Sequence, residues 1–199
     1  MLTRDRLCAE KLRGGLLIGR EVIVLEETES TNDVVAQMAT GDWPEGLCVF
    51  AEHQTGGRGQ RGNRWESVAG KGLWFSILLK PKIDIKDSAR LTTWAAGIIA
   101  ETIQNELELS ATVKPPNDVY VDGRKVAGVL AEMRAQTGAP HVAVLGIGLN
   151  VNHASSDFSE ELRERATSLA ILHRRRIDRH LLGVALLRNL DRTYPEVFG

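Results

Sequence analysis

Hydrophobic residues gather in short runs, and turn-forming residues separate these runs from one another. Runs bounded by glycine, proline, aspartate or asparagine are typical of strands. Elsewhere the apolar residues recur at the helical repeat, which predicts helices with one buried face. The pattern predicts strands over residues 21–25, 47–53, 72–80 and 141–149, and helices over residues 32–39, 87–108 and 178–191.

The middle of the chain carries the pattern of a β-hairpin. Residues 119–121 and 124–134 are extended in pattern, and Asp122-Gly123 between them favours a tight turn. A short extended piece, residues 111–114, precedes them. Hairpins with helices inserted between some strands predict an α+β fold, with flanking helices on a mixed or antiparallel sheet. Regular crossover helices are missing, which argues against a doubly wound dinucleotide-binding fold.

Both ends of the chain are expected to be helical. The segment up to Gly14-Gly15 predicts a short helix that glycine ends, and the chain from Ser159 onward predicts further helices. A turn is expected around Gly138-Ala139-Pro140. Because no long linker divides the sequence, residues 1–199 are expected to form one domain.

Composition narrows the classes of function. The chain has 199 residues, 43% hydrophobic and 26% charged, as in an ordinary globular domain. A formal net charge of −1 gives no general attraction to nucleic acid or to an acidic membrane. No apolar run has the length of a membrane span, and the charged N-terminus is unlike a signal peptide. Cys8 and Cys48 match no metal spacing, so we expect free thiols and a cytoplasmic protein without a membrane partner.

A glycine-rich basic loop occupies residues 53–65, HQTGGRGQRGNRW. Its glycines let the backbone approach a ligand closely, and Arg58 could pair with a phosphate. Few packing contacts predict a loop that is mobile until a ligand orders it. It is not a Walker A loop, and the G-x-G-x-x-G letters from Gly57 to Gly62 precede a strand where that motif needs a helix. A solvated loop or an RNA-binding segment has a similar composition.

Two further segments place polar residues at strand ends. In residues 114–130, KPPNDVYVDGRKVAGVL, prolines hold Lys114 extended and Lys125 lies on the returning strand. The two lysines could face one anionic ligand, or they could be solvated. In residues 146–152, GIGLNVN, glycines suggest close approach of a ligand, and an asparagine can recognise a purine edge. A simple strand-end turn is the alternative.

Taken in order, these segments resemble the biotin–protein ligase family. The matching pieces are ESTN at 29–32, QTGGRGQRGNRW at 54–65, KPPND at 114–118, KVAGVL at 125–130 and GIGLN at 146–150. Several motifs in the family's order are far more specific than any one alone. The resemblance implies a sheet-centred α+β catalytic domain, related to class II aminoacyl-tRNA synthetases, that uses ATP and Mg²⁺.

The resemblance also implies the reaction. Biotin's carboxylate attacks the α-phosphate of ATP, pyrophosphate leaves, and biotinyl-5′-AMP stays bound. A lysine of a biotin carboxyl carrier domain, in acetyl-CoA carboxylase or a related carboxylase, then displaces AMP. The site must neutralise two anionic reactants, and the family-matched catalytic residues for that work are Arg58 and Lys114. We expect Lys114 to be a buried charge whose loss cripples adenylate formation.

Site residues carry over motif by motif, and the metal ligands stay unassigned. A helix N-cap is the alternative role for Ser30-Thr31-Asn32, and core packing is the alternative for Trp65. The implied biotin-binding residues are Ser30, Thr31, Asn32, Gln54, Gly57, Arg58, Gly59, Gln60, Lys114 and Gly128. The implied ATP- and adenylate-binding residues are Arg61, Trp65, Asn117, Lys125 and Asn150.

The sequence departs from the family pattern at several places. Gln60 stands where many members carry an arginine that helps hold the adenylate, which puts tight retention in doubt. Pro115 stands where the family usually has tryptophan, so a stiffer segment with altered packing is expected. Because the first predicted strand begins at residue 21, we expect no N-terminal helix-turn-helix domain and no DNA binding. We also expect the small C-terminal β-barrel of many relatives to be absent.

Three other functions remain open at this point. A lipoate–protein ligase shares the adenylate chemistry, although the basic loop and residues 114–118 favour biotin. A non-catalytic biotin- or adenylate-binding module would keep the pocket without turnover. RNA binding could use the loop and the run Arg174-Arg175-Arg176, whose ordinary role is a solvated face. The resemblance also suggests a homodimer formed through the sheet.

Overall fold

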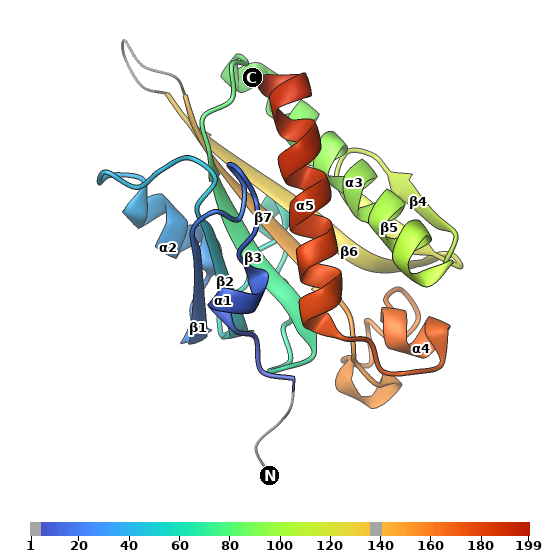
Figure 1. The fold of residues 1–199 in the computed structure, drawn as a ribbon. Coiled ribbons are helices and arrows are strands. Elements are labelled where there is room, and N and C mark those ends of the chain that lie inside the picture. Colours follow the sequence, from blue (N-terminus) through green and yellow to red (C-terminus); the bar gives the residue numbers. More distant parts are fainter. Residues whose placement is uncertain (1–4, 136–140) are drawn as a thin grey trace.

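The computed structural model describes residues 5–135 and 141–199, which build one seven-stranded sheet (Figure 1). The spatial order is β1-β2-β3-β7-β6-β5-β4. Strands β1 and β2 run parallel and the other neighbouring pairs run antiparallel, so the expected α+β fold on a mixed sheet is confirmed. The strands are β1 (Val22–Thr28), β2 (Cys48–Gln54), β3 (Gly72–Leu79), β4 (Ala111–Lys114), β5 (Asp118–Val121), β6 (Arg124–Arg134) and β7 (Val142–Asn150).

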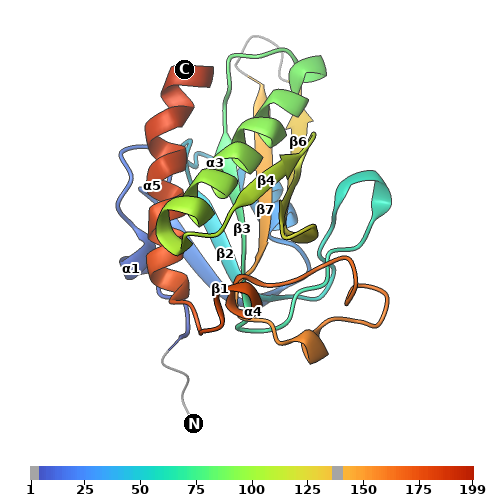
Figure 2. The ribbon, with the colours of Figure 1, turned by 90° about the vertical axis from the view of Figure 1, so that its right-hand side faces the viewer.

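Helices cover the two faces of the sheet unequally. The two long helices lie side by side across one face (Figure 2). A single short helix, α2, packs on β2, β3 and β7 from the other side. The helices are α1 (Ala9–Leu12), α2 (Thr31–Met38), α3 (Ala89–Leu107), α4 (Leu169–His173) and α5 (Arg179–Phe198), with 3-10 turns η1 (Gln60–Gly62), η2 (Ile85–Asp87) and η3 (Ser155–Asp157). None of these helices is both long and apolar enough to cross a membrane.

The hydrophobic core has one large and one small part because the helices cover the two faces of the sheet unequally. The main apolar cluster fills the space under α3 and α5, and includes Phe75, Ile99 and Leu186. A smaller cluster around Val35 and Val144 lies under α2. Because α2 has only eight residues, it protects only part of its face, and the remainder of that face is free to form a ligand site.

The expected hairpin and most expected elements are confirmed. Asp122 and Gly123 both have positive φ, 49° and 73°, as a tight hairpin of this kind requires. The expected helix over 178–191 continues to Phe198. The turn expected around residues 138–140 lies outside the described residues.

The expectation of helices directly from Ser159 is wrong for residues 159–168. These residues form turns, although Leu162 and Arg163 make the local bonds of a first helical turn to Ser159. The backbone of Lys125 then donates to Arg165 and accepts from Thr167. That bridge to the end of the sheet pulls the chain into an extended path and competes with continued helix.

Candidate active site

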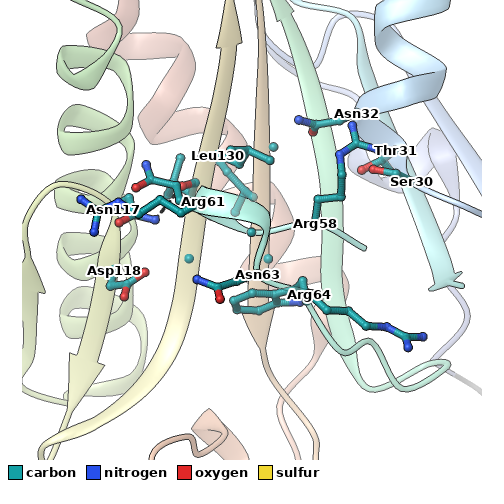
Figure 3. Close-up of a pocket in the computed structure, with 18 of the residues that line it drawn as sticks. Ser30, Thr31, Asn32, Arg58, Arg61, Asn63, Arg64, Asn117, Asp118 and Leu130 are labelled. Carbon is teal, nitrogen blue, oxygen red and sulfur yellow. Dashed lines mark hydrogen bonds between the residues drawn. The ribbon is translucent and has the colours of Figure 1, made fainter. Parts of the chain in front are cut away.

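The uncovered part of the sheet forms the floor of a cavity of about 300 Å³ beside α2 (Figure 3). We call this the main pocket. Ser30, Thr31 and Asn32 lie at one side, and Asn117 and Asp118 lie at the other. Arg61, Asn63 and Arg64 come from the loop between β2 and β3. The pocket therefore joins the three sequence segments that carried the expected chemistry.

Three glycines on β6 and β7 allow side chains to lie directly on the sheet. A Cβ added at Gly146 would be 2.2 Å from Oδ1 of Asn32, and one at Gly148 would be 2.5 Å from Cε2 of Trp65. A Cβ at Gly128 would lie 2.9 Å from Cζ3 of Trp65. Contacts this short are not tolerated, so glycine at these positions makes the pocket floor possible.

A continuous hydrogen-bond chain lies beneath the α2 side of the pocket. Oε1 of Gln54 accepts from the backbone N–H of Thr31 at 2.8 Å and lies 3.1 Å from its hydroxyl. That hydroxyl is 2.7 Å from the Ser76 hydroxyl, which donates to Oδ1 of Asn32 at 2.6 Å. Nδ2 of Asn32 donates to Glu132 at 2.6 Å. Thr31, Asn32 and Ser76 are buried, and the groups of this chain satisfy one another and so hold a fixed polar surface.

Ser30 occupies the N-cap position of α2, yet its side chain makes no capping hydrogen bond. The residue is 3% exposed and lines the main pocket. A helix cap alone therefore does not account for this serine, and its hydroxyl is free to bind a ligand.

Arg58 is held by two carboxylates beside the pocket. Its Nη1 and Nη2 atoms lie 2.6 and 2.7 Å from the two oxygens of Asp33, and Nη2 lies 3.3 Å from Glu132. Hydrogen bonds to Asp33 are the main reason why the pKa of Arg58 is raised further above its ordinary value. The guanidinium lines the pocket as a permanent, oriented cation.

The opposite side of the pocket presents Lys125. Its Nζ lies 2.6 Å from Oδ1 of Asp118 and 5.4 Å from the centre of the Trp65 ring. The two side chains are close enough to form an ion pair, although the angles at Oδ1 are not those of a hydrogen bond. Asn117 lies alongside and donates from Nδ2 to the carbonyl of Val129, which fixes its orientation. Lys125 is thus a positioned cation at the pocket edge.

Three of the expected residues do not line the main pocket, namely Lys114, Gly57 and Asn150. Lys114 is exposed on the edge strand β4, with its Nζ 5.4 Å from the centre of the Tyr120 ring, so the expectation of a buried charge is wrong. Exposure alternates along β4, and Lys114 falls at an exposed position of this edge strand. Gly57 does not line the pocket either. A Cβ there would be 2.7 Å from the Trp65 carbonyl, so this glycine allows the loop to close on itself.

A second cavity of about 100 Å³ adjoins the main pocket, and we call it the side pocket. Arg64, Trp65 and Lys125 line both cavities. Asn150 lines the side pocket and donates from Nδ2 to the Thr167 carbonyl at 3.2 Å. The half-buried Trp65 therefore divides one longer cleft, with biotin-matched residues at one end and Asn150 at the other.

No group of three or more histidine, cysteine, aspartate or glutamate side chains that could hold a metal ion occurs among residues 5–135 and 141–199. Asp118 is the carboxylate that lines the main pocket within that part of the chain. Mg²⁺ commonly binds through one or two carboxylates together with substrate phosphates. Asp118 fits that role, whereas a dedicated all-protein metal cage is not formed there.

Comparison with known proteins gives the family. Residues 24–150 match the profile of the biotin/lipoate A/B protein ligase family. The chain belongs to this family. It is 35% identical over 177 residues to the bifunctional ligase/repressor BirA of Bacillus spizizenii, covering 87% of this chain and 54% of that protein. It is 35% identical over 205 residues to the biotin–[acetyl-CoA-carboxylase] ligase of Mycobacterium tuberculosis, covering 96% of this chain and 73% of that protein.

Solved structures of the family have the same fold. Biotin protein ligase from Aquifex aeolicus in complex with biotin and ATP is similar with a TM-score of 0.73 and 30% identity, over 90% of this chain and 74% of that one. This likeness confirms the expected biotin-ligase fold. The chain spans about half the length of the BirA relatives that it matches.

The family motifs in the sequence did not identify three residues that shape the pocket, namely Asp33, Ser76 and Glu132. Ser76 could have been noticed as the polar residue within the apolar strand GLWFSILL. Asp33 is adjacent to a matched motif, and Glu132 lies two strand positions beyond Leu130. Their contacts with Thr31, Asn32 and Arg58 join segments far apart in sequence, so no local pattern predicts them.

Proposed function

We propose that this chain carries the catalytic domain of a biotin–protein ligase, which makes biotinyl-5′-AMP from biotin and ATP and transfers biotin to a lysine of a carrier domain. The observation that carries the proposal is the cleft that Trp65 divides. One end offers the fixed polar surface of Thr31 and Gln54, the middle offers cations, and the far end offers the Asn150 amide. This order suits the polar head group of biotin at one end, the two reacting anions in the middle and the adenine base of ATP at the far end.

In the first step, an oxygen of the biotin carboxylate forms a bond to the α-phosphorus of ATP. The bond from that phosphorus to the bridging oxygen breaks, and pyrophosphate leaves with the electron pair. Both reactants are anionic, so cations fixed in place lower the barrier most. We assign this task to Lys125, with Arg58 and the loop residues Arg61 and Arg64 alongside.

In the second step, the carrier lysine attacks the acyl carbon of the mixed anhydride as a free amine. The acyl carbon–oxygen bond breaks, AMP leaves as an anion, and the new amide loses one proton. No nucleophile from the enzyme is needed, which agrees with the absence of cysteine and histidine among the described residues lining the main pocket. The glycine-rich loop would exclude water from the adenylate.

Mg²⁺ would neutralise phosphate charge, and Asp118 is the residue that we propose to hold it together with the phosphates. The proposed partner is the carrier domain of acetyl-CoA carboxylase, since the Mycobacterium tuberculosis relative is named for that acceptor. Cys8 and Cys48 are free thiols, which supports the proposal of a cytoplasmic site of action.

We also propose a homodimer through the sheet. Strand β6 pairs with β5 only from Arg124 to Gly128, so in the described chain the outer edge of residues 131–134 has no neighbouring strand. An unpaired edge favours addition of another strand. Sedimentation of the protein with and without biotin and ATP would test this, and a monomer under every condition would contradict it.

The test of the proposed function is the mass of a purified carrier domain after incubation with this protein, ATP, Mg²⁺ and either biotin or lipoate. We expect a gain of one biotin that requires ATP, and none with K125A. A gain of lipoate alone would establish the lipoate-ligase alternative. Biotin binding without pyrophosphate release would mean a binding module, and neither binding nor turnover would contradict the proposal.

A further inference from the structure

A third hollow, of about 900 Å³, lies between the N-terminal segment, the start of β3 and α4. We call it the basic groove. It contains the arginine run that follows α4, a feature of the sequence that ligase chemistry does not use. Six cationic side chains line it, namely Arg6, Lys71, Arg174, Arg175, Arg176 and Arg179. Three acidic side chains line it as well, namely Asp5, Glu26 and Glu52.

The floor of the basic groove is already neutralised. Arg179 is 1% exposed, and its Nη1 lies 2.9 Å from Glu52 while its Nε lies 3.4 Å from Asp5. Asp5 also pairs with Arg176 at 2.6 Å. A small anion that bound at the floor would be repelled by these carboxylates, which already neutralise the arginines there.

The rim differs from the floor. Arg6 pairs with Glu26, and Lys71 lies 3.3 Å from Asp157. Arg174 and Arg175 have no carboxylate partner among the described residues, and Nε of Arg175 donates only to the His173 ring at 2.6 Å. Both arginines are exposed. Two free guanidinium groups at an open rim suit a protein surface that brings its own carboxylates, because Arg pairs with carboxylates through two parallel bonds.

Nucleic acid fits the groove less well. Binding a phosphate backbone requires a row of free cations along its path, and each one contributes separately to the affinity. Only two of the six groove cations are free of carboxylate partners within the described chain, and the whole chain has a net charge of −1. Charge complementarity therefore favours an acidic protein face over RNA.

The groove lies next to the reacting cleft. His153 is 3% exposed, lines both the groove and the side pocket, and has an unpartnered Nδ1. The side pocket shares Trp65 and Lys125 with the main pocket. A protein seated on the groove would therefore lie beside the position where its lysine must react.

We propose that the basic groove docks an acidic face of the acceptor protein, with Arg174 and Arg175 as the contacting cations. This inference rests on the proposed ligase function. It predicts that R174E/R175E lowers kcat/KM for transfer to the carrier domain roughly tenfold or more, mainly through KM, because reversal turns attraction into repulsion. Biotin-dependent exchange of pyrophosphate into ATP, which needs no acceptor, should not change.

The matched control is R20E/R188E, which reverses two exposed arginines that do not line the groove and have no ion pair among the described residues. It should leave transfer within about twofold of wild type. R174K/R175K keeps the charge and should recover most of the lost activity. The transfer rate of wild type should also fall with added salt more steeply than that of R174E/R175E.

Several results would overturn the inference. Equal transfer by R174E/R175E and wild type would remove the groove from acceptor binding, and an equal loss in pyrophosphate exchange would assign it to nucleotide. Loss of binding to a labelled single-stranded RNA, with transfer intact, would favour RNA. If the wild-type protein lacks ligase activity, the proposed function is wrong, and this result by itself says nothing about docking at the groove. Direct binding of the carrier domain to wild type and R174E/R175E, by calorimetry, then decides the docking proposal alone.

Discussion

Arg58 and Asp33 form a two-pronged ion pair at the edge of the main pocket, with N–O separations of 2.6 and 2.7 Å. The pair joins the glycine-rich loop to the first turn of α2. Glu132 on β6 approaches the same guanidinium at 3.3 Å. The chain thus positions its pocket arginine with its own carboxylates, and that arginine in turn shields an anionic ligand from them.

Replacement of Arg58 should therefore weaken biotin binding in two ways. R58A removes a cation and leaves two carboxylates without their arginine beside the pocket, so we expect the affinity for biotin to fall roughly 100-fold. In D33A/R58A one repelling carboxylate is gone, and part of that loss, about tenfold, should return. Calorimetric titration of biotin measures both. No recovery of affinity in D33A/R58A relative to R58A would contradict this account.

The two lysines of the hairpin region should behave differently. Lys125 lines the pocket beside Asp118, whereas Lys114 is exposed on β4. We expect K125A to lower adenylate formation by at least roughly 100-fold and K114A to change it less than about twofold. Biotin-dependent pyrophosphate exchange measures this, with circular dichroism as the check on folding. A severe defect in K114A would restore the role that its sequence motif suggested.

The glycine floor can be tested with one methyl group. In G148A the new Cβ would lie 2.5 Å from the Trp65 indole, so the ring must move. We expect nucleotide affinity to fall roughly tenfold, because Trp65 separates the two parts of the cleft. Gly97 in α3 is the matched control, since a Cβ there meets nothing within 4 Å. G97A should stabilise the protein by about 0.5–1 kcal/mol without affecting binding. Unchanged affinity in G148A would mean that the indole position is unimportant.

His153 predicts a pH dependence of stability. Burial lowers its pKa from 6.5 to about 4, opposed by Asp157 and aided by Lys71. Between these values the unfolded chain binds a proton that the folded chain does not. The contribution of His153 to the free energy of unfolding should thus be fully present above pH 6.5. It should fall by about 1–3 kcal/mol as the pH drops to 4.

Urea unfolding of wild type and H153F at several pH values between 7 and 4 measures this effect. Phenylalanine keeps the stack on Phe158 and cannot titrate, so H153F should lose that part of the pH dependence. The same fall in both proteins would mean that other groups cause it.

The sequence by itself determined most of the elements and the family. Short apolar runs bounded by turn residues predicted the strands, Asp122-Gly123 predicted the hairpin, and the motifs from ESTN to GIGLN identified most of the cleft residues, because each of these signals is local in the chain. It also identified Gln60 and Pro115 as departures, and both line the main pocket.

Only the tertiary structure decided which charges meet. It placed Lys125 at the pocket and Lys114 outside it, although both belong to one matched segment. It brought Ser76 and Glu132 against α2, and it gathered the arginine run with Lys71 and Arg6 around one groove. These relations depend on strand order and on which face each side chain occupies. Contacts between distant segments set both, and no local pattern of residues records them.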